Sequence, residues 1–345
     1  MKLGLQLGYW FAQPPTDAGE RVQEAERLGY DTVFAAEAWG SDAFTPLAWH
    51  GSQTSRIRLG TSIVQISART PAATAMHALT LDHLTGGRLV LGLGVSGPQV
   101  VEGWYGQPFG KPLARTREYV DIVRQVLARK EPVTSDGPHY PLPYTGPNAL
   151  GLGKPLKPIV HPLRADVPIW LGAEGPRNVA MTAEIADGWL PIYYSPAVAD
   201  MYNGWLAEGF ARPGARQTRD TFEIATSCQV VVTDDVQAGI DGLRPFVAFY
   251  IGGMGAKDMN FHKEVFSRMG YEKESDEIQD LFFEGKRDEA IAAVPDQMVT
   301  DISLIGPPEK IRDEVARWEE AGVTMLNVGA TTIDEMRTTA EVIFG

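Results

Sequence analysis

The sequence predicts an α/β protein whose parallel strands close into a (β/α)8 TIM barrel with insertion segments. The chain has 345 residues, a length at which α/β barrels occur as one domain. A recurring pattern of amphipathic helix, glycine and short apolar run indicates right-handed βαβ units and a parallel sheet. Eight strand-like runs can be counted, which favours a closed barrel over the alternative, a doubly wound open sheet.

Four of the eight apolar runs directly follow a helix-like segment that ends at a glycine. Glycine there suits a left-handed C-cap, and a run that is apolar on both faces is typical of a buried parallel strand. These junctions lie at 26–37, 83–94, 184–194 and 319–330. Four further strands are expected without the full junction, at 3–9, 58–66, 167–173 and 222–232.

Helical periodicity fills the segments between the runs. Apolar residues recur at helical spacing through 18–28, and Gly29 is the expected stop. Similar stripes along 119–127 and 311–318 predict two more helices, the second of which begins after a proline pair.

Two segments depart from the simple repeat. Residues 131–166 are dense in proline and glycine and show no helical period, so we expect a long ordered excursion. Residues 235–300 are mostly helical and polar-faced, which predicts a helical insertion between the seventh and eighth strands. The whole chain, 1–345, is interpreted as one barrel domain that carries these two insertions.

The composition narrows the classes of function. Thirty-one Lys and Arg against 44 Asp and Glu give a net charge of −13, which argues against nucleic acid and anionic membrane surfaces as partners. The single cysteine, Cys228, excludes an intrachain disulfide. No secretory signal is evident at the N-terminus and no apolar run approaches a membrane span, so a cytoplasmic enzyme is expected.

In a barrel of this type, function gathers at the carboxyl ends of the strands. The residues expected there are rich in aromatics and glycines and poor in paired carboxylates. None of the six histidines pairs with another at helical spacing, so no metal site is expected. Glycines allow close approach of a flat ligand and aromatics give it an apolar wall, which suits a planar cofactor.

Two glycine-rich segments invite a phosphate interpretation. Gly92, Gly94 and Gly97 have dinucleotide-binding spacing, but no acidic residue follows at the distance that such a fingerprint needs, so tight packing at a strand end is favoured. In 172–189, a Gly-Pro turn after a strand opens a helix near Arg177. Such a helix N-terminus can bind phosphate, although a surface arginine on a proline-started helix is the plain alternative.

At these residues the sequence resembles the luciferase-like monooxygenase superfamily, and most closely its branch that uses the deazaflavin coenzyme F420. The matching blocks cover most of the chain in the expected order, and they are less specific for F420 over FMN than for the superfamily. They are LGTSIVQ (59–65), TGGRLVLGLGVSG (85–97), EGWYGQPFGKPLARTREYVDIVR (102–124), VPIWLGAEGPRNVAMTAEIADGW (167–189) and GPPEKIRDEVARWEEAGVTMLNV (306–328).

The resemblance implies a coenzyme at the strand carboxyl ends. It implies a cis peptide bond between Ser62 and Ile63, in a bulge that backs the deazaflavin, with Gln65 as a further coenzyme contact. It places Gly94, Val95 and Ser96 along the coenzyme, and Glu174, Gly175, Arg177 and Asn178 at its phosphate.

Two departures from the family's sugar-phosphate dehydrogenases matter. Those enzymes have an Asp-His pair after the second strand, where this chain has Glu37 and Ala38. They also carry a catalytic Glu where this chain has Gly97. The sugar-phosphate mechanism is therefore not transferable to this chain.

Glu37 is the first candidate for a catalytic carboxylate, because a carboxylate against the wall of Trp39 can exchange protons near neutral pH. The alternative is a salt-bridged or helix-capping Glu. Tyr9, Trp10, Trp39 and Tyr193 are expected to line the substrate pocket.

F420 carries a phosphate and an oligoglutamate tail, so an acidic chain must concentrate positive charge locally to hold it. The candidates for this role are Arg69, Lys111, Arg115, Arg117, Arg164 and Arg177.

The leading hypothesis is an oxidoreductase that moves a hydride between F420 and a small organic substrate, an alcohol or an activated double bond. The alternatives are an FMN-dependent monooxygenase on the same barrel and a non-catalytic F420-binding protein. A barrel aldolase is disfavoured by the lack of a Schiff-base lysine. The resemblance also suggests a homodimer.

Overall fold

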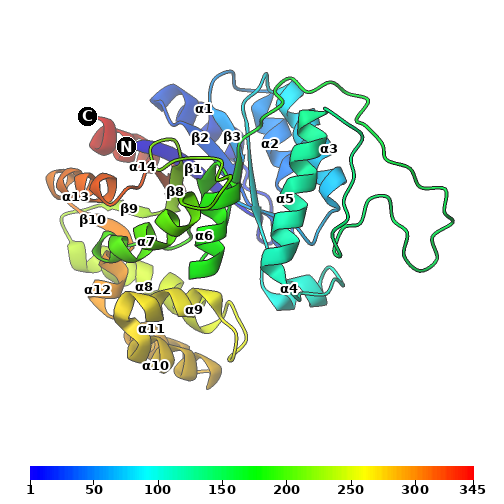
Figure 1. Cartoon of the computed structure of the whole chain (residues 1–345). Helices are drawn as coiled ribbons and strands as arrows, with labels where there is room; N and C mark the ends of the chain where they lie inside the picture. Colours follow the sequence, from blue (N-terminus) through cyan, green and yellow to red (C-terminus); the bar gives the residue numbers. More distant parts are fainter.

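In a computed structural model, which describes residues 1–345, the parallel strands close into a barrel with helices around it (Figure 1). Closure is made by β3 and β5, which pair at Leu59 with Leu89 and at Gly60 with Val90. The predicted TIM barrel is confirmed. The strands of this sheet are β1 (Lys2–Gly8), β2 (Thr32–Ala35), β3 (Arg58–Thr61), β4 (Val64–Gln65), β5 (Leu89–Gly94), β6 (Ile169–Leu171), β7 (Gly188–Trp189), β8 (Glu223–Ser227) and β11 (Met325–Val328).

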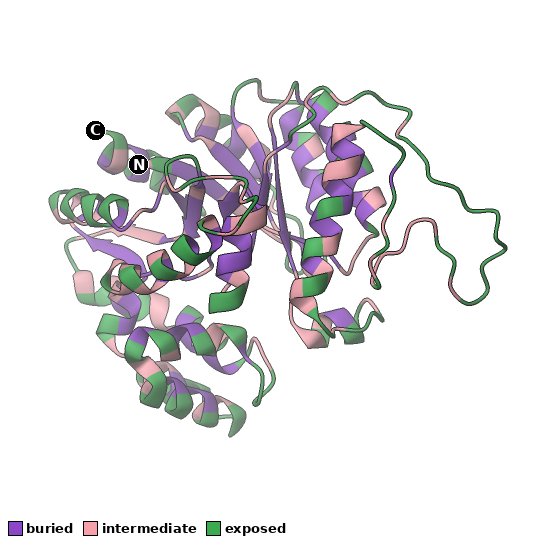
Figure 2. Cartoon of the chain, in the orientation of Figure 1, coloured by how far each residue is buried: buried purple, intermediate pink, exposed green.

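Helices surround the barrel and bury their apolar stripes against it, so the strands are buried while the outer helix faces are exposed (Figure 2). The expected glycine stop is present, since Gly29 ends the first helix with a φ of 89°. The surrounding helices are α1 (Ala18–Leu28), α2 (Phe44–Gly51), α3 (Pro71–Leu84), α4 (Pro98–Gly103), α5 (Pro112–Ala128), α6 (Pro176–Ile185), the 3₁₀ turn η1 (Pro196–Val198), α7 (Ala199–Phe210), α13 (Pro308–Glu320) and α14 (Ile333–Phe344).

The barrel interior is filled by side chains from several strands. Phe34 lies at its centre, and its ring leaves no room for a side chain on two neighbouring strands. A Cβ at Gly4 would lie 2.9 Å from the ring, and one at Gly60 would lie 2.4 Å from it. Phe34 belongs to a cluster of buried side chains that fills the interior, called the plug here: Phe34, Val90, Trp170, Leu190, Ala225 and Met325. Ile63 packs against this plug.

The run 222–232 is not one strand, which corrects the prediction. After β8 the chain makes one more hydrogen bond to the barrel, from the Cys228 N–H to the Asn327 carbonyl at 3.1 Å. It then leaves the barrel as β9 (Gln229–Val232), which pairs in parallel with β10 (Ser303–Gly306) outside it. The sequence did not indicate β10, because an apolar run does not show which partner it will pair with.

The helical segment predicted over 235–300 hangs between β9 and β10 and lies at the same end of the barrel as α4 (Figure 1). It consists of α8 (Val236–Gly252), α9 (Phe261–Phe266), a π-type turn η2 (Ser267–Tyr271), α10 (Glu272–Phe283), α11 (Arg287–Ala292) and α12 (Asp296–Thr300).

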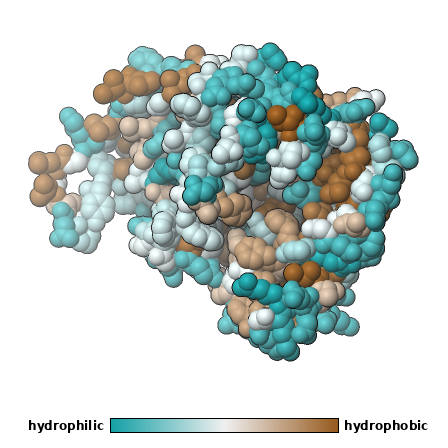
Figure 3. All heavy atoms as spheres, turned by 180° about the vertical axis from the view of Figure 1, so that it is seen from behind, coloured by the Kyte–Doolittle hydropathy of each residue, from teal (hydrophilic) through white to brown (hydrophobic).

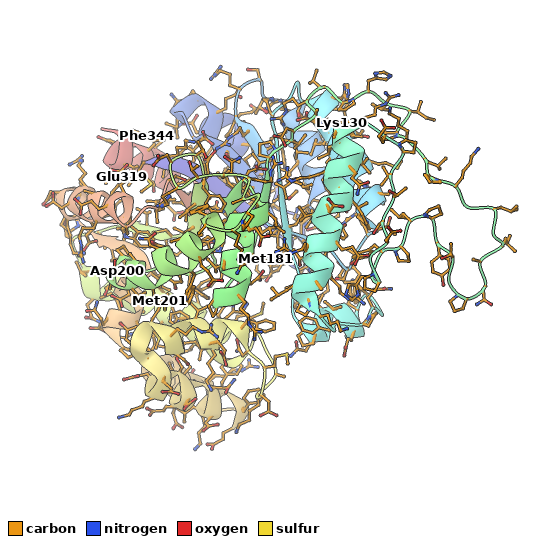
Figure 4. The ribbon with its side chains drawn as sticks, in the orientation of Figure 1. Lys130, Met181, Asp200, Met201, Glu319 and Phe344 are labelled. Atoms are coloured by element: carbon orange, nitrogen blue, oxygen red, sulfur yellow. The ribbon has the colours of Figure 1, made fainter.

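The Pro/Gly-rich excursion, 131–166, forms no helix or strand and projects away from the barrel (Figure 1). Its base is tied where α5 ends, because the Lys157 Nζ donates to the carbonyl of Lys130 at 2.6 Å (Figure 4). Beyond the base, apolar side chains stand exposed, visible at the left edge of Figure 3. The apolar side chains at the tip therefore do not pack on the rest of the protein.

The filled interior makes Gly60 a test of the packing. Gly60→Ala should lower the free energy of unfolding by about 1–3 kcal/mol, because the new methyl group would overlap the Phe34 ring. Urea denaturation measures this. Gly204→Ala, in α7 with no atom near the new Cβ, is the matched control and should be neutral or stabilising. Equal stability of the two variants would contradict the packing argument.

Candidate functional site

The candidate site lies at the carboxyl ends of the barrel strands, where α4 and α9 face the barrel from its open end (Figure 1). The third strand is interrupted here. A cis peptide bond joins Ser62 to Ile63 between β3 and β4, as the resemblance implied.

Glycines of the neighbouring strands accommodate the interrupted strand. A Cβ on Gly92 would lie 1.8 Å from the Thr61 carbonyl oxygen, and one on Gly94 would lie 2.8 Å from the Ile63 side chain. A Cβ on Gly172 would lie 3.3 Å from the Ile63 side chain. The glycines of β5 are therefore explained by close strand packing, which agrees with the packing interpretation and not with the dinucleotide one.

Gln65 presents an unused acceptor at the end of β4. Its Nε2 donates to the Glu37 carbonyl at 2.9 Å, while its Oε1 is buried and has no partner in the protein. Burying an amide oxygen without a hydrogen-bond partner costs free energy. A ligand with an N–H group at this position would supply the missing donor.

Glu37 is held by a guanidinium. Its Oε1 accepts from Arg69 Nη1 at 2.9 Å, and its Oε2 lies 2.7 Å from Arg69 Nη2. Its side chain is 3% exposed, whereas Trp39 is 53% exposed. The structure thus shows the alternative named for Glu37, a salt-bridged carboxylate, because the loop after β4 brings Arg69 to it. Its catalytic role stays a prediction.

The helix N-terminus expected to bind phosphate is present. Gly175 is the N-cap of α6, Pro176 is its first residue, and no side chain caps the turn. Arg177 is exposed and has no carboxylate partner, and Asn178 is half-buried beside it. Free N–H groups, the helix dipole and an unpaired guanidinium together favour an anion at this turn.

Three of the six predicted cationic side chains are already neutralised. Arg69 pairs with Glu37, Arg117 with Glu184, and Arg164 with Asp82. The other three, Lys111, Arg115 and Arg177, have no carboxylate within ion-pair distance and remain available to an anionic ligand.

After β5 the chain turns sharply across the mouth. Gly94 is buried, Val95 is half-buried, and Ser96 adopts a left-handed conformation with a φ of 62°. Such a conformation is uncommon outside glycine and typical of functional turns.

Glu174 faces a residue of the helical insertion. His262 of α9 places its Nδ1 2.9 Å from Glu174 Oε1, and the two side chains are about four-fifths buried. Burial favours the neutral imidazole, but the Glu174 carboxylate outweighs it and raises the pKa of His262. His262 could not be predicted as a site residue, because nothing in the sequence indicates which end of the barrel the insertion covers.

The predicted pocket aromatics divide into two groups. Trp10 and Trp39 are exposed at the mouth, and Tyr9 is half-buried there. Tyr193 is 4% exposed and lies beneath the insertion, 4.7 Å from the Phe266 ring centroid. Its ring also meets the His262 ring edge-to-face, with centroids 6.1 Å apart. Its role as a pocket wall stays a prediction.

The loop after α4 meets the insertion across the mouth. The rings of Phe109 and Phe261 are stacked with centroids 6.2 Å apart. The loop after α4 and the insertion therefore contact each other at the open end of the barrel.

This barrel and site define a class of protein. Residues 4–325 match the model of the luciferase-like monooxygenase family. The chain belongs to the luciferase-like monooxygenase family.

Individual relatives agree with this. A Mycobacterium tuberculosis protein named as a coenzyme F420-dependent oxidoreductase is 64% identical over 99% of both chains. A 5,10-methylenetetrahydromethanopterin reductase of Archaeoglobus fulgidus is 27% identical over 90% of this chain and 88% of its own. The solved structure of a coenzyme F420-dependent tetrahydromethanopterin reductase from Methanopyrus kandleri has a TM-score of 0.80 at 22% identity, covering 99% of this chain and 98% of that one. The family resemblance and the prediction of an enzyme are confirmed. No helix of the chain has the length and apolar character needed to cross a membrane.

The Glu174–His262 pair predicts a pH-dependent stability. Since the folded protein raises the pKa of His262 above its usual 6.5, the folded state binds the proton more tightly than the unfolded chain. The pair's contribution to stability is therefore complete below about pH 6.5 and is lost as pH rises through the folded pKa.

Glu174→Gln should flatten this part of the curve of unfolding free energy against pH, measured by urea denaturation between about pH 5.5 and pH 8.5. Glu264→Gln, which removes the mostly exposed partner of Arg268, is the control and should keep the slope. An unchanged slope in Glu174→Gln would count against the pair.

Proposed function

We propose that this protein is an F420-dependent oxidoreductase that transfers a hydride between the deazaflavin coenzyme and an organic substrate, an alcohol or an activated double bond. The observation that carries the proposal is the 64% identity, along the whole chain, to a protein named as a coenzyme F420-dependent oxidoreductase. The geometry of the mouth supports it independently.

The residues at the mouth fit such a coenzyme. The unpartnered Gln65 Oε1 suits an N–H group on the edge of a planar heterocycle. Ile63, flanked by Gly94 and Gly172, offers a flat apolar floor for its ring, and the α6 N-terminus with Arg177 suits its phosphate. We propose that Ser62, Ile63, Gln65, Gly94, Val95, Ser96, Gly175, Arg177 and Asn178 hold the coenzyme.

The coenzyme, when bound, supplies the hydride chemistry, and the protein supplies binding, orientation and proton transfer. Gly92 and Gly94 of β5 and Gly172, which follows β6, leave room for the interrupted strand to pack closely. Glu37 would act as a positioning residue, because its carboxylate fixes Arg69 and its carbonyl fixes Gln65. Tyr9, Trp10 and Trp39 would form the substrate walls and exclude water.

One placement is revised within this proposal. Glu174 was expected at the coenzyme phosphate, yet its carboxylate faces His262. A carboxylate beside a phosphate would repel it, and Glu174 faces His262 at 2.9 Å instead. We therefore propose Gly175, Arg177 and Asn178 as the phosphate contacts and leave Glu174 to His262.

The proposal predicts that oxidised F420 quenches tryptophan fluorescence with micromolar, salt-sensitive affinity, because its anionic tail meets unpaired cations. Arg177→Ala should weaken binding about tenfold, since a charge-assisted hydrogen bond contributes roughly 1.5–3 kcal/mol. Arg312→Ala, an exposed and unpaired arginine on α13, is the control and should bind like wild type.

FMN provides the discriminating comparison, because the α6 N-terminus would accept its single phosphate equally well. Tighter binding of FMN than of F420 would indicate an oxygen-using monooxygenase instead. Tight F420 binding without turnover on any alcohol or enone would indicate the carrier alternative.

We also propose that the protein works as a homodimer, with the excursion reaching a second copy. Leu150, Leu152 and Ile159 are 88%, 82% and 94% exposed. The tip that carries the first two, residues 141–153, contains no charged residue, so it would meet a second acidic chain without repulsion. The exposed Met76 and Leu84 of α3 extend this apolar surface, since the His83 Nε2 bonds the His161 carbonyl at 2.8 Å.

The double variant Leu150→Asp with Leu152→Asp should convert a dimer, twice 37.7 kDa, to a monomer in sedimentation equilibrium, because a buried carboxylate without a partner is strongly unfavourable. Phe283→Asp, an exposed apolar residue on α10, is the control and should remain dimeric. A monomeric wild-type protein would refute the proposal directly.

A further inference from the structure

The insertion brings one histidine to the site, and its surroundings are those of a proton-transfer group. His262 is the second residue of α9. Its neighbour, Phe261, stacks on Phe109 of the loop after α4, so His262 lies where the insertion closes on the barrel mouth.

The two ring nitrogens of His262 differ in their surroundings. Nδ1 is buried and lies at ion-pair distance, 2.9 Å, from Glu174 Oε1. Nε2 has no hydrogen-bond partner in the protein and, unlike Nδ1, is not fully buried. A carboxylate that orients an imidazole while leaving Nε2 open is the arrangement that makes a histidine an effective acid or base.

Aromatic rings hold the imidazole in this orientation. Tyr250 of α8 and Tyr193 after β7 meet it edge-to-face, with centroid distances of 5.0 and 6.1 Å. The Tyr193 hydroxyl is buried and unpartnered, and so is Glu174 Oε2. The titratable groups facing His262 are thus Glu174, Tyr193 and Tyr250, while the nearby Lys263 is occupied by Asp276 at 2.6 Å.

Other titratable side chains have partners of their own. Both carboxylate oxygens of Glu37 contact Arg69. The Nδ1 of His77 lies 2.7 Å from the Ala73 carbonyl within α3, and His83, near the end of that helix, bonds the excursion. His262 is the histidine at the strand ends that combines a carboxylate partner with an open nitrogen.

We propose that His262, oriented by Glu174, takes or gives the proton that accompanies hydride transfer at this site. The inference rests on the proposed function and names a residue for one of its steps. In alcohol oxidation, the carbinol C–H bond breaks and its hydride, with both electrons, passes to oxidised F420. The O–H proton passes to the neutral Nε2, which leaves a carbonyl product and an imidazolium. Reduction of a carbonyl by reduced F420 is the reverse.

The first test needs no turnover. Imidazole ¹⁵N–¹H spectra of the full-length protein should show His262 titrating above pH 6.5, and Glu174→Gln should lower that pKa, because the opposing charge is removed. Addition of oxidised F420 should shift the Nε2 resonance. His161→Gln, in the excursion, is the control and should change none of these signals.

The second test uses kinetics with oxidised F420 and a series of secondary alcohols from 2-propanol to 2-decanol, and reduced F420 with the matching ketones. His262→Gln should bind F420 within about twofold of wild type but lose roughly 10²–10⁴-fold in kcat. For alcohol oxidation, the rate should rise with pH through the His262 pKa. In Glu174→Gln this limb should move to lower pH, whereas a merely structural role would not displace it.

Distinct results overturn the inference. A His262→Gln variant with wild-type kcat and F420 affinity weakened tenfold would make His262 an anchor for the anionic coenzyme. If the Nε2 resonance of His262 did not change when F420 was added, His262 would have only a structural role. Failure of the wild type to bind F420 would refute the proposed function itself. Binding without turnover of either substrate series would contradict the proposed function and this inference with it.

Discussion

The filling of the barrel interior is the constraint on which the rest of the structure depends. The Phe34 ring occupies the space that side chains at positions 4 and 60 would need, so both positions are glycine. The resulting plug closes the barrel from within, and Ile63 rests on it. At the amino end of the strands, Arg58 pairs with Asp31 and Glu223. Only the carboxyl end is therefore left for a ligand, and its floor is rigid.

The charge at the open end of the barrel depends on which charged side chains there have no partner of opposite charge. The chain carries −13 overall, yet Arg177 at the α6 N-terminus and Arg115 near the loop after α4 have no carboxylate partner. Glu37 is neutralised by Arg69, and Glu174 lies 2.9 Å from His262. The site thus presents a locally cationic surface inside an acidic protein, which suits an anionic coenzyme and limits nonspecific binding of other polyanions.

The insertion covers part of the open end of the barrel. It is attached through the small β9–β10 sheet outside the barrel and packs on the barrel, where Phe266 meets Tyr193. The stacked Phe109 and Phe261 rings join the loop after α4 to the insertion, and the Glu174–His262 pair lies behind that contact. Residues far apart in the sequence are brought together by this arrangement, which allows a substrate site to vary without changing the barrel.

The sequence by itself determined the barrel and most of its strand positions, because these depend on local periodicity, and the family, because its motifs are contiguous. Only the tertiary structure decided which side chains pair with each other. It paired Glu37 with Arg69, sent residues 229–232 out of the barrel, and set His262 against Glu174. The physical reason is that hydropathy records whether a residue is buried, whereas the identity of its partner depends on contacts between segments that no local pattern encodes.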